Sequence, residues 1–247
     1  MAAASPFTSK TLAFLRALTR NNDREWFRAH AVEYESHVKA PMLLAVARIG
    51  EEFRVLAPEL MADPKKSLYR IWRDTRFSAD KRPLKTNVAA VFPHRLGTRH
   101  SSAGLYFEIA PKWVFAGGGI YMPEPGDLVK IRQRIASEPQ KFHRLVSAER
   151  LQAIGGIQGE RLTRVPRGFP ADHPAAEYLR LKHYLGYREW PPDFATSANF
   201  WPELLATFAA VMPLVRYLNE TIGVGERTTN SEQRTTSSER RTTNDEL

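Results

Sequence analysis

Residues 105–121, LYFEIAPKWVFAGGGIY, carry a clear strand–turn–strand pattern. In its first part apolar residues alternate with Tyr106 and Glu108, the pattern of a strand with one buried face. The connection that follows is far too short for the crossover that parallel neighbours require. We therefore predict two antiparallel strands, over 105–110 and 114–121.

On both sides of this hairpin, the sequence pattern predicts further strands or helices. Upstream, two more aromatic or β-branched stretches, 68–75 and 86–92, are predicted as strands. Helical periodicity then dominates before Pro58 and again after Pro123, with one helix predicted from Asp172 through Lys182. Helices, then strands, then helices predict an α+β fold: a central, mostly antiparallel sheet flanked by N- and C-terminal helices, in a single domain over 1–224.

The last part of the chain, 225–247, has a different composition. Arg-Thr-Thr recurs there every seven residues, at 227, 234 and 241. The repeat has no apolar seam, so a coiled coil is not expected. It has too little apolar surface to offset its ordering entropy, and we predict a disordered polar tail. The tail holds four basic and five acidic residues, so the net charge of +9 belongs to the preceding domain.

Composition limits the function classes. Cysteine is absent, which excludes disulfides, a thiol nucleophile and Cys-ligated metal. The start of the chain does not read as a signal peptide, and no stretch approaches the roughly 20 apolar residues of a membrane helix. We expect a cytoplasmic protein without a membrane partner. A sequence pI near 9.9 favours an anionic partner, either a small molecule or a nucleic acid.

The positive charge is concentrated in residues 65–85, which contain eight basic and two acidic residues. Such a surplus is unfavourable unless an anion, a carboxylate network or solvent balances it. One hypothesis is a site for phosphate or carboxylate; the other is an internal Arg–carboxylate network with solvated lysines. The candidate anion-binding residues are Arg70, Arg73, Arg76, Lys81 and Lys85.

Two carboxylates are candidates for acid–base chemistry. Asp74 lies among the arginines, where it could orient one of them or act as a general base, and Glu108 lies on a predicted strand. Salt bridges to the arginines are the competing interpretation of both. No HExxH motif and no cluster with metal-ligand spacing is present, so no metal site is predicted. The run Gly117-Gly118-Gly119 indicates a bulge or a close backbone approach, which can also border a pocket.

Several separated motifs together resemble a known family. These are NNDREWF at 21–27, RIWRDTRFSADKRPLKT at 70–86, GGGIYMPEP at 117–125 and FPADHPAAEYLRLKHY at 169–184. In this order they resemble the family called domain of unknown function 2461, over about residues 10–220. The family has no established activity, so the resemblance implies a name without a mechanism or a cofactor. Leu84 departs from the pattern, because an aromatic residue is more usual there. Matching the family pattern adds the candidate pocket-lining residues Trp26, Phe77, Gly118, Gly119, His173 and Lys182.

Two functions from different classes remain open at this point. The first is an anion- or phosphate-binding protein that uses the basic strand and turn to hold a phosphorylated ligand, a nucleotide or a nucleic acid. The alternative is a metal-independent enzyme on an anionic substrate, with Asp74 or Glu108 as acid or base. A structural protein whose charges are all satisfied internally is the third outcome. The sequence does not name a ligand, a reaction or an oligomeric state.

Overall fold

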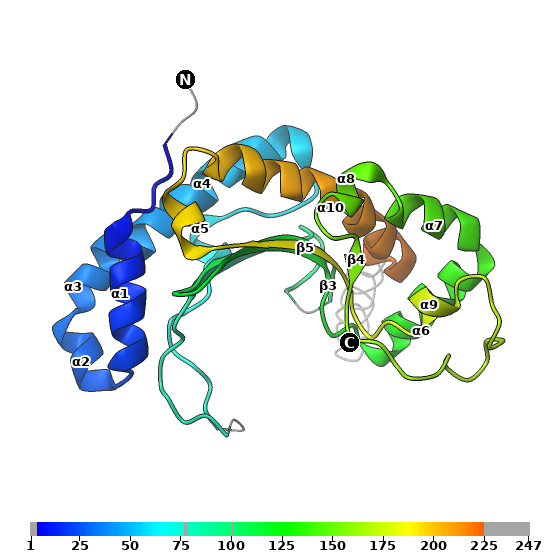
Figure 1. The fold of residues 1–247 in the computed structure, drawn as a ribbon, viewed down its shortest axis with the longest axis horizontal. Helices are drawn as coiled ribbons and strands as arrows, with labels where there is room; N and C mark the ends of the chain where they lie inside the picture. Colours follow the sequence, from blue (N-terminus) through cyan, green and yellow to red (C-terminus); the bar gives the residue numbers. More distant parts are fainter. Residues whose placement is uncertain (1–3, 77–78, 100, 225–247) are drawn as a thin grey trace, which may run out of the picture.

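The structure, a computed structural model, describes residues 4–76, 79–99 and 101–224 (Figure 1). The predicted tail and the candidate residue Phe77 therefore lie outside the described residues. A curved sheet occupies the middle of the molecule, and groups of helices lie beyond both of its ends. None of the described helices combines the length and the apolar character that a bilayer-spanning segment needs.

The sheet has five strands in the order β1-β2-β3-β5-β4, and every neighbouring pair is antiparallel. This confirms the predicted α+β class with a central antiparallel sheet. The strand bounds are β1 (Val88–Pro93), β2 (Gly104–Ile109), β3 (Val114–Ile120), β4 (Ile157–Gln158) and β5 (Tyr184–Trp190). Strands β4 and β5 were not expected from the sequence. The helix predicted from Asp172 is much shorter than expected, because only α9 (Ala176–Leu179) forms before β5 begins.

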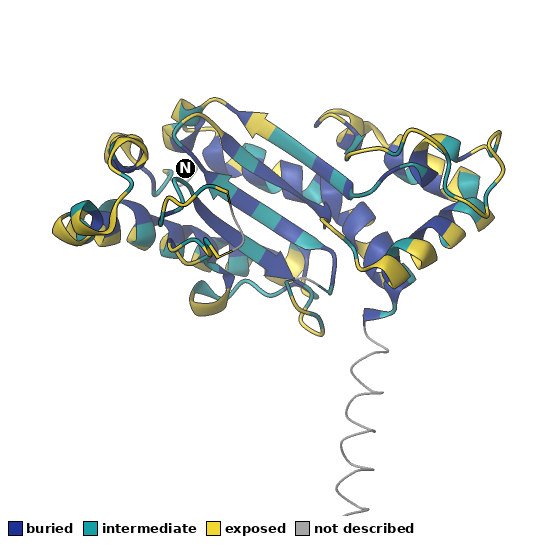
Figure 2. Ribbon diagram, turned by 90° about the horizontal axis from the view of Figure 1, so that it is seen from below, coloured by how far each residue is buried: buried dark blue, intermediate teal, exposed yellow. Residues whose placement is uncertain are grey.

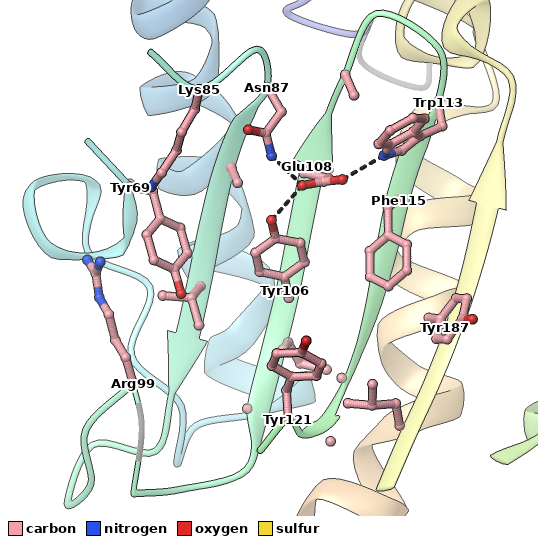
Figure 3. A pocket seen from close by; sticks show the side chains of 18 of the residues that line it. Tyr69, Lys85, Asn87, Arg99, Tyr106, Glu108, Trp113, Phe115, Tyr121 and Tyr187 are labelled. Atoms are coloured by element: carbon pink, nitrogen blue, oxygen red, sulfur yellow. Dashed lines mark hydrogen bonds between the residues drawn. The ribbon is translucent and has the colours of Figure 1, made fainter. Parts of the chain in front are cut away.

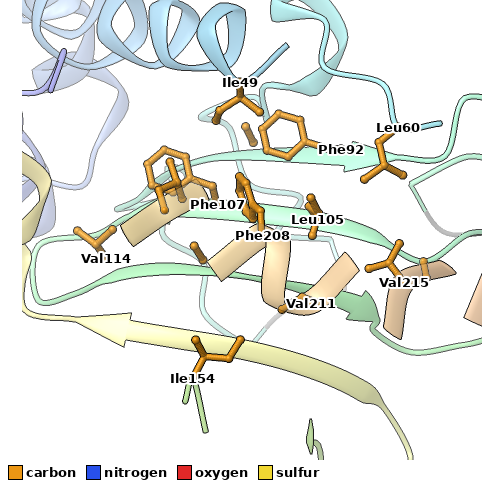
Figure 4. Close-up of a cluster of buried hydrophobic side chains, with 14 of the residues drawn as sticks. Ile49, Leu60, Phe92, Leu105, Phe107, Val114, Ile154, Phe208, Val211 and Val215 are labelled. Carbon is orange, nitrogen blue, oxygen red and sulfur yellow. The ribbon is translucent and has the colours of Figure 1, made fainter. Parts of the chain in front are cut away.

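One face of the sheet is covered by two long helices, α4 (Ala40–Leu56) and α10 (Phe200–Ile222). Between helices and strands lies the main apolar core, shown in Figure 4. Phe53 of α4 and Phe208 of α10 both pack edge-on against Phe92 of β1, with ring centroids 5.3 and 5.9 Å apart. Gly223, in a left-handed conformation, ends α10.

The remaining helices leave the opposite face of the sheet largely uncovered (Figures 1 and 2). At the N-terminal end of the molecule lie α1 (Ser9–Arg20), α2 (Arg24–Ala29), α3 (Ala31–Tyr34) and the π-helical turn η1 (Glu35–Lys39). Beyond the other end lie α6 (Pro125–Ser137), α7 (Pro139–Val146) and α9. The shorter helices are α5 (Pro64–Ser67), α8 (Glu149–Gln152) and the 3-10 turn η2 (Pro192–Thr196). Figure 2 shows the open face, whose strands are mostly buried or half-buried.

The basic segment is not the regular strand predicted over 68–75. It forms an irregular hairpin, in which Trp72 bridges Leu84 and the Lys85 amide donates to the Ile71 carbonyl at 2.8 Å. Among the described residues, the isolated bridge between Leu68 and Ala90 and the hydrogen bond from the Tyr69 amide to the Ala89 carbonyl at 2.9 Å join it to β1. The prediction of a strand is wrong because these residues pair with the returning arm of their own turn instead of continuing the sheet.

The base of this hairpin is fixed by the first family motif. The Asn22 side chain, between α1 and α2, accepts from the Leu84 amide and donates to the Leu84 carbonyl, both at 3.0 Å. Phe27 of α2 packs edge-on against Trp72, with ring centroids 5.5 Å apart. Two motifs about fifty residues apart in the sequence are therefore one structural unit, which we call the basic hairpin (residues 68–85).

Candidate functional site

A cavity of about 910 Å³ lies on the open face of the sheet. Strands β1, β2, β3 and β5 form its floor, and the base of the basic hairpin forms one wall (Figure 3). The strand alternation explains its lining, because Leu105 and Phe107 point into the core while Tyr106 and Glu108 point to the open side. Tyr106 and Glu108, which alternate with the core residues of β2, thus line a cavity.

Several positions in the floor of the cavity are glycines and carry no side chain. Gly104 and Gly119 are register partners in β2 and β3, and both border the cavity. A Cβ atom on Gly119 would lie 2.0 Å from the Tyr184 carbonyl oxygen, and its φ of 128° disfavours any L side chain. Gly118 also borders the cavity, although a Cβ there would meet Leu105 at 2.6 Å. The glycine run thus fits both a close backbone approach and a pocket border.

Aromatic rings stand around this floor. Phe115 of β3 lies between Tyr106 and Tyr187, with ring centroids 5.8 and 4.7 Å away. Trp113 and Tyr121 stand at the two ends of β3, as Figure 3 shows. The cavity therefore presents flat apolar surfaces next to glycine positions of the sheet, which suits a planar ligand.

Glu108 projects from β2 into the cavity and accepts three hydrogen bonds (Figure 3). Its Oε2 accepts from Asn87 Nδ2 at 2.5 Å and from Tyr106 Oη at 2.6 Å, and its Oε1 accepts from Trp113 Nε1 at 2.6 Å. Burial, and then the neighbouring Glu108 carboxylate, raise the pKa of Tyr106 far above its ordinary value. The phenol therefore remains a donor at neutral pH, and the carboxylate is held in one orientation.

Positive charge gathers around Tyr69, at the β1 side of the cavity. Lys85 Nζ and Arg99 Cζ lie 4.7 and 4.8 Å from the centre of the Tyr69 ring, within cation–π range. Burial lowers the pKa of Lys85, and the positive charges of Arg70, Arg99 and Arg73 lower it further. An anion bound at this position would reduce that repulsion.

The remaining charges of the basic hairpin are arranged differently. Arg73, which also borders the cavity, pairs with Asp80 at 2.5 Å, and Asp80 pairs with Arg82 at 2.7 Å. Asp74 pairs with Arg76 at 2.7 Å, and this hydrogen-bonded arginine lowers the pKa of Asp74 to about 2. Asp74 and Asp80 therefore pair with arginines of the hairpin itself, and these pairs do not tie the sheet to the helices.

The five candidate anion-binding residues thus separate in space. Arg73 and Lys85 border the cavity, whereas Arg76 and Lys81 are exposed outside it. Lys81 donates to the Thr75 carbonyl at 3.0 Å. Arg70 borders a second hollow of about 700 Å³, between the hairpin and the N-terminal helices. Of the two candidate carboxylates, Glu108 borders the large cavity and Asp74 does not.

The candidates taken from the family pattern are scattered as well. Gly118 and Gly119 border the cavity. Trp26 stacks on His30 at 4.1 Å, next to the core of the N-terminal helices. His173 accepts from the Ala175 amide, and Lys182 pairs with Glu160; neither borders the cavity.

Several cavity residues were not predicted as site residues. The main ones are Tyr69, Asn87, Arg99, Tyr106, Trp113, Phe115 and Tyr187. Tyr106 could have been found, because it alternates with the core residues of β2 and must face the same side as Glu108. Arg99 had no comparable signal, since it lies outside the basic segment and reaches Tyr69 only through the fold.

Comparisons with known proteins place the chain in a family. In the part of the chain that the structure describes, no group of three or more His, Cys, Asp or Glu residues is arranged to hold a metal ion. No curated protein and no solved structure has detectable similarity to the chain. One family model does match, over residues 10–217, and its description is conserved hypothetical protein, DUF2461. Since this match spans most of the chain and agrees with the motif resemblance, the protein belongs to the DUF2461 family of conserved hypothetical proteins.

Proposed function

We propose that the protein binds a phosphorylated ligand in the cavity on the open face of the sheet. The anion subsite consists of Lys85 and Arg99 on either side of Tyr69, with Arg73 at its border. Arginine and lysine are the usual phosphate partners in proteins, and a partly enclosed site strengthens each such contact. A cavity of about 910 Å³ has room for a ligand of mononucleotide size.

The observation that carries this proposal is an asymmetry in charge pairing. Arg73, Arg76 and Arg82 each have an aspartate partner within 2.7 Å. Lys85 and Arg99 form no ion pair with a carboxylate in residues 4–76, 79–99 and 101–224. Lys85, at the base of the hairpin, and Arg99, in the loop after β1, thus border the cavity without a carboxylate partner among the described residues. A bound anion supplies the missing charge.

The experiment is a titration with pyrophosphate and with AMP, followed by calorimetry, at low and at physiological salt. We expect Lys85→Met to weaken binding of both by about tenfold or more, because it removes a charge-assisted contact. Lys81→Met is the matched control, since it removes the same charge from the same hairpin outside the cavity. Binding that survives Lys85→Met unchanged, or that falls equally in both variants, overturns the proposed site.

The enzyme alternative depends on Glu108. Asp74 is exposed, paired with Arg76 and outside the cavity, which argues against a role for it at the same ligand. Glu108 is inside the cavity, but three donors already hold it. Those contacts favour a role in holding and orienting a ligand over a role in proton transfer. Turnover of a bound phosphate ester that is abolished by Glu108→Gln would support the alternative.

A further inference from the structure

We infer that Glu108 selects the ligand, and that the ligand is a nucleotide whose base carries an exocyclic amino group. The inference rests on the proposed function and names its substrate class. The amino group donates to Glu108 Oε1, while the phosphate lies against Lys85 and Arg99. Three features of the cavity favour such a ligand: the acceptor capacity of Glu108, the aromatic surfaces beside it, and the positive charge across the cavity.

The Glu108 carboxylate keeps an acceptor position for a ligand. A carboxylate has about four acceptor positions, two on each oxygen. Asn87 and Tyr106 both donate to Oε2, whereas Trp113 alone donates to Oε1. All three donors are neutral, and no described Lys, Arg or His lies within 4 Å of the carboxylate. One acceptor position on Oε1 and a full negative charge are thus available to a donor of the ligand.

Aromatic side chains surround the part of the cavity beside the carboxylate. Next to Glu108, the open face of β2 and β3 carries Tyr106 and Phe115, and the Gly104–Gly119 pair borders the same cavity four residues further along β2. Tyr106, Phe115 and Tyr187 supply aromatic faces around that space (Figure 3). Stacking on aromatic side chains is a common way for proteins to hold a nucleobase, and it tolerates any base. The aromatic surfaces therefore bind the ring, and discrimination is left to Glu108.

Positive charge lies across the cavity from Glu108. Figure 3 shows Glu108 on β2, with Lys85, Tyr69 and Arg99 together beyond β1. One cavity thus offers an acceptor at its centre and two cations at one edge. A ligand that satisfies both has a donor on its planar part and an anion on its other part. A nucleoside monophosphate with an amino-substituted base has this arrangement, and a base without that group leaves the second acceptor position of Oε1 without a donor.

The test uses two ligand pairs that differ only in the exocyclic amino group. AMP is compared with purine riboside 5′-monophosphate, and GMP with IMP, by calorimetric titration of the unmodified protein. We expect at least one amino-bearing nucleotide to bind about tenfold or more tightly than its partner, as for a hydrogen bond to a charged group. Because no variant is needed, this comparison does not depend on any substitution folding correctly.

Glu108→Gln then identifies the residue responsible. The amide keeps the size of the side chain but removes its charge, so the preference within the pair should fall to about threefold or less. Binding of the ligand without the amino group should still depend on Lys85, since its phosphate contacts remain. A preference that persists in Glu108→Gln, or the lack of any preference in the unmodified protein, overturns the inference.

The outcomes separate this inference from the proposed function. If pyrophosphate and all four nucleotides fail to bind, the proposed function fails and the inference fails with it. If they bind in a manner that depends on Lys85 but without preference for the amino group, only the inference fails. If nucleotides bind no more tightly than pyrophosphate, the base does not enter the cavity, and the inference fails again.

Discussion

Replacing Gly119 by alanine places a methyl group against the backbone of the neighbouring strand. The added Cβ would lie 2.0 Å from the Tyr184 carbonyl oxygen and 3.0 Å from the Leu185 Cα. These are backbone atoms of β5, which cannot rotate away as a side chain can. The φ of 128° at Gly119 adds a conformational cost, because L residues rarely adopt that region. Both effects act on the floor of the cavity.

The expected loss of stability has two parts. A residue held in a sparsely populated backbone region costs about 1–3 kcal/mol. Overpacking in a well-packed region costs about another 1–3 kcal/mol. Gly119→Ala should therefore lower the free energy of unfolding by about 2–6 kcal/mol, which is a large part of the roughly 5–15 kcal/mol of a typical domain.

Urea denaturation followed by circular dichroism measures this loss. With a slope of about 2–3 kcal/mol per molar urea, the midpoint should fall by about 0.7–3 M. Two glycines serve as matched controls. Gly168 has a φ of 93° but open space around its added Cβ, and Gly126 has open space and lies in the first turn of α6.

The controls separate the two costs. Gly168→Ala should show the conformational cost alone, and Gly126→Ala should be neutral or slightly stabilising, since alanine is the better helix former. Gly119→Ala should exceed both. If it destabilises the protein no more than Gly168→Ala does, β3 and β5 can separate at little cost, and the reasoning about a rigid glycine floor is refuted.

Three further predictions concern the rest of the molecule. Asn219→Ala should destabilise by about 2–4 kcal/mol, because the buried Asn219 side chain bonds both the amide and the carbonyl of Ala103, at 2.8 and 3.0 Å; a urea midpoint close to that of the unmodified protein would contradict this. Burial raises the pKa of Tyr34 to about 12. The contribution of its neutral phenol to the free energy of unfolding is therefore complete below about pH 10 and is lost towards pH 12. Tyr34→Phe should make the fall of the urea midpoint at alkaline pH shallower. Asp74→Asn removes an exposed pair with Arg76 and should leave both the urea midpoint and the pyrophosphate affinity unchanged; weaker pyrophosphate binding would indicate that Asp74 belongs to the site.

The part of the fold that could be predicted is the part whose pattern is local. In β2 every second residue is buried, so the period of two is visible in the sequence and both strands of its hairpin were predicted. In β5 the core side holds Gly186, which packs against Val211, and Arg188, which pairs with Glu203 of α10 at 2.6 Å. A strand whose buried side includes a glycine and a paired arginine has no apolar period, so β5 was missed.

The candidate site was predicted in part for a similar reason. Charge density pointed to the basic hairpin, and alternation placed Glu108 on a sheet face. Neither could show that Asp80 and Asp74 neutralise the hairpin tip, because those pairs depend on how the turn folds back. Arg99 joins Lys85 at Tyr69 only because the loop after β1 returns to the hairpin base.

The α+β class, the β2–β3 hairpin, the family and the surplus of positive charge could all be predicted from the amino-acid sequence. Composition and side-chain period depend on neighbouring residues, so both can be recognised before the fold is known. Which charges are neutralised, and which face an open cavity, depends on the folded chain. Ion pairing depends on separations of a few ångströms between residues such as Arg73 and Asp80, and chain order does not fix those separations. The same holds for Glu108, whose three donors come from β2 itself, from the residues just before β1 and from the connection to β3.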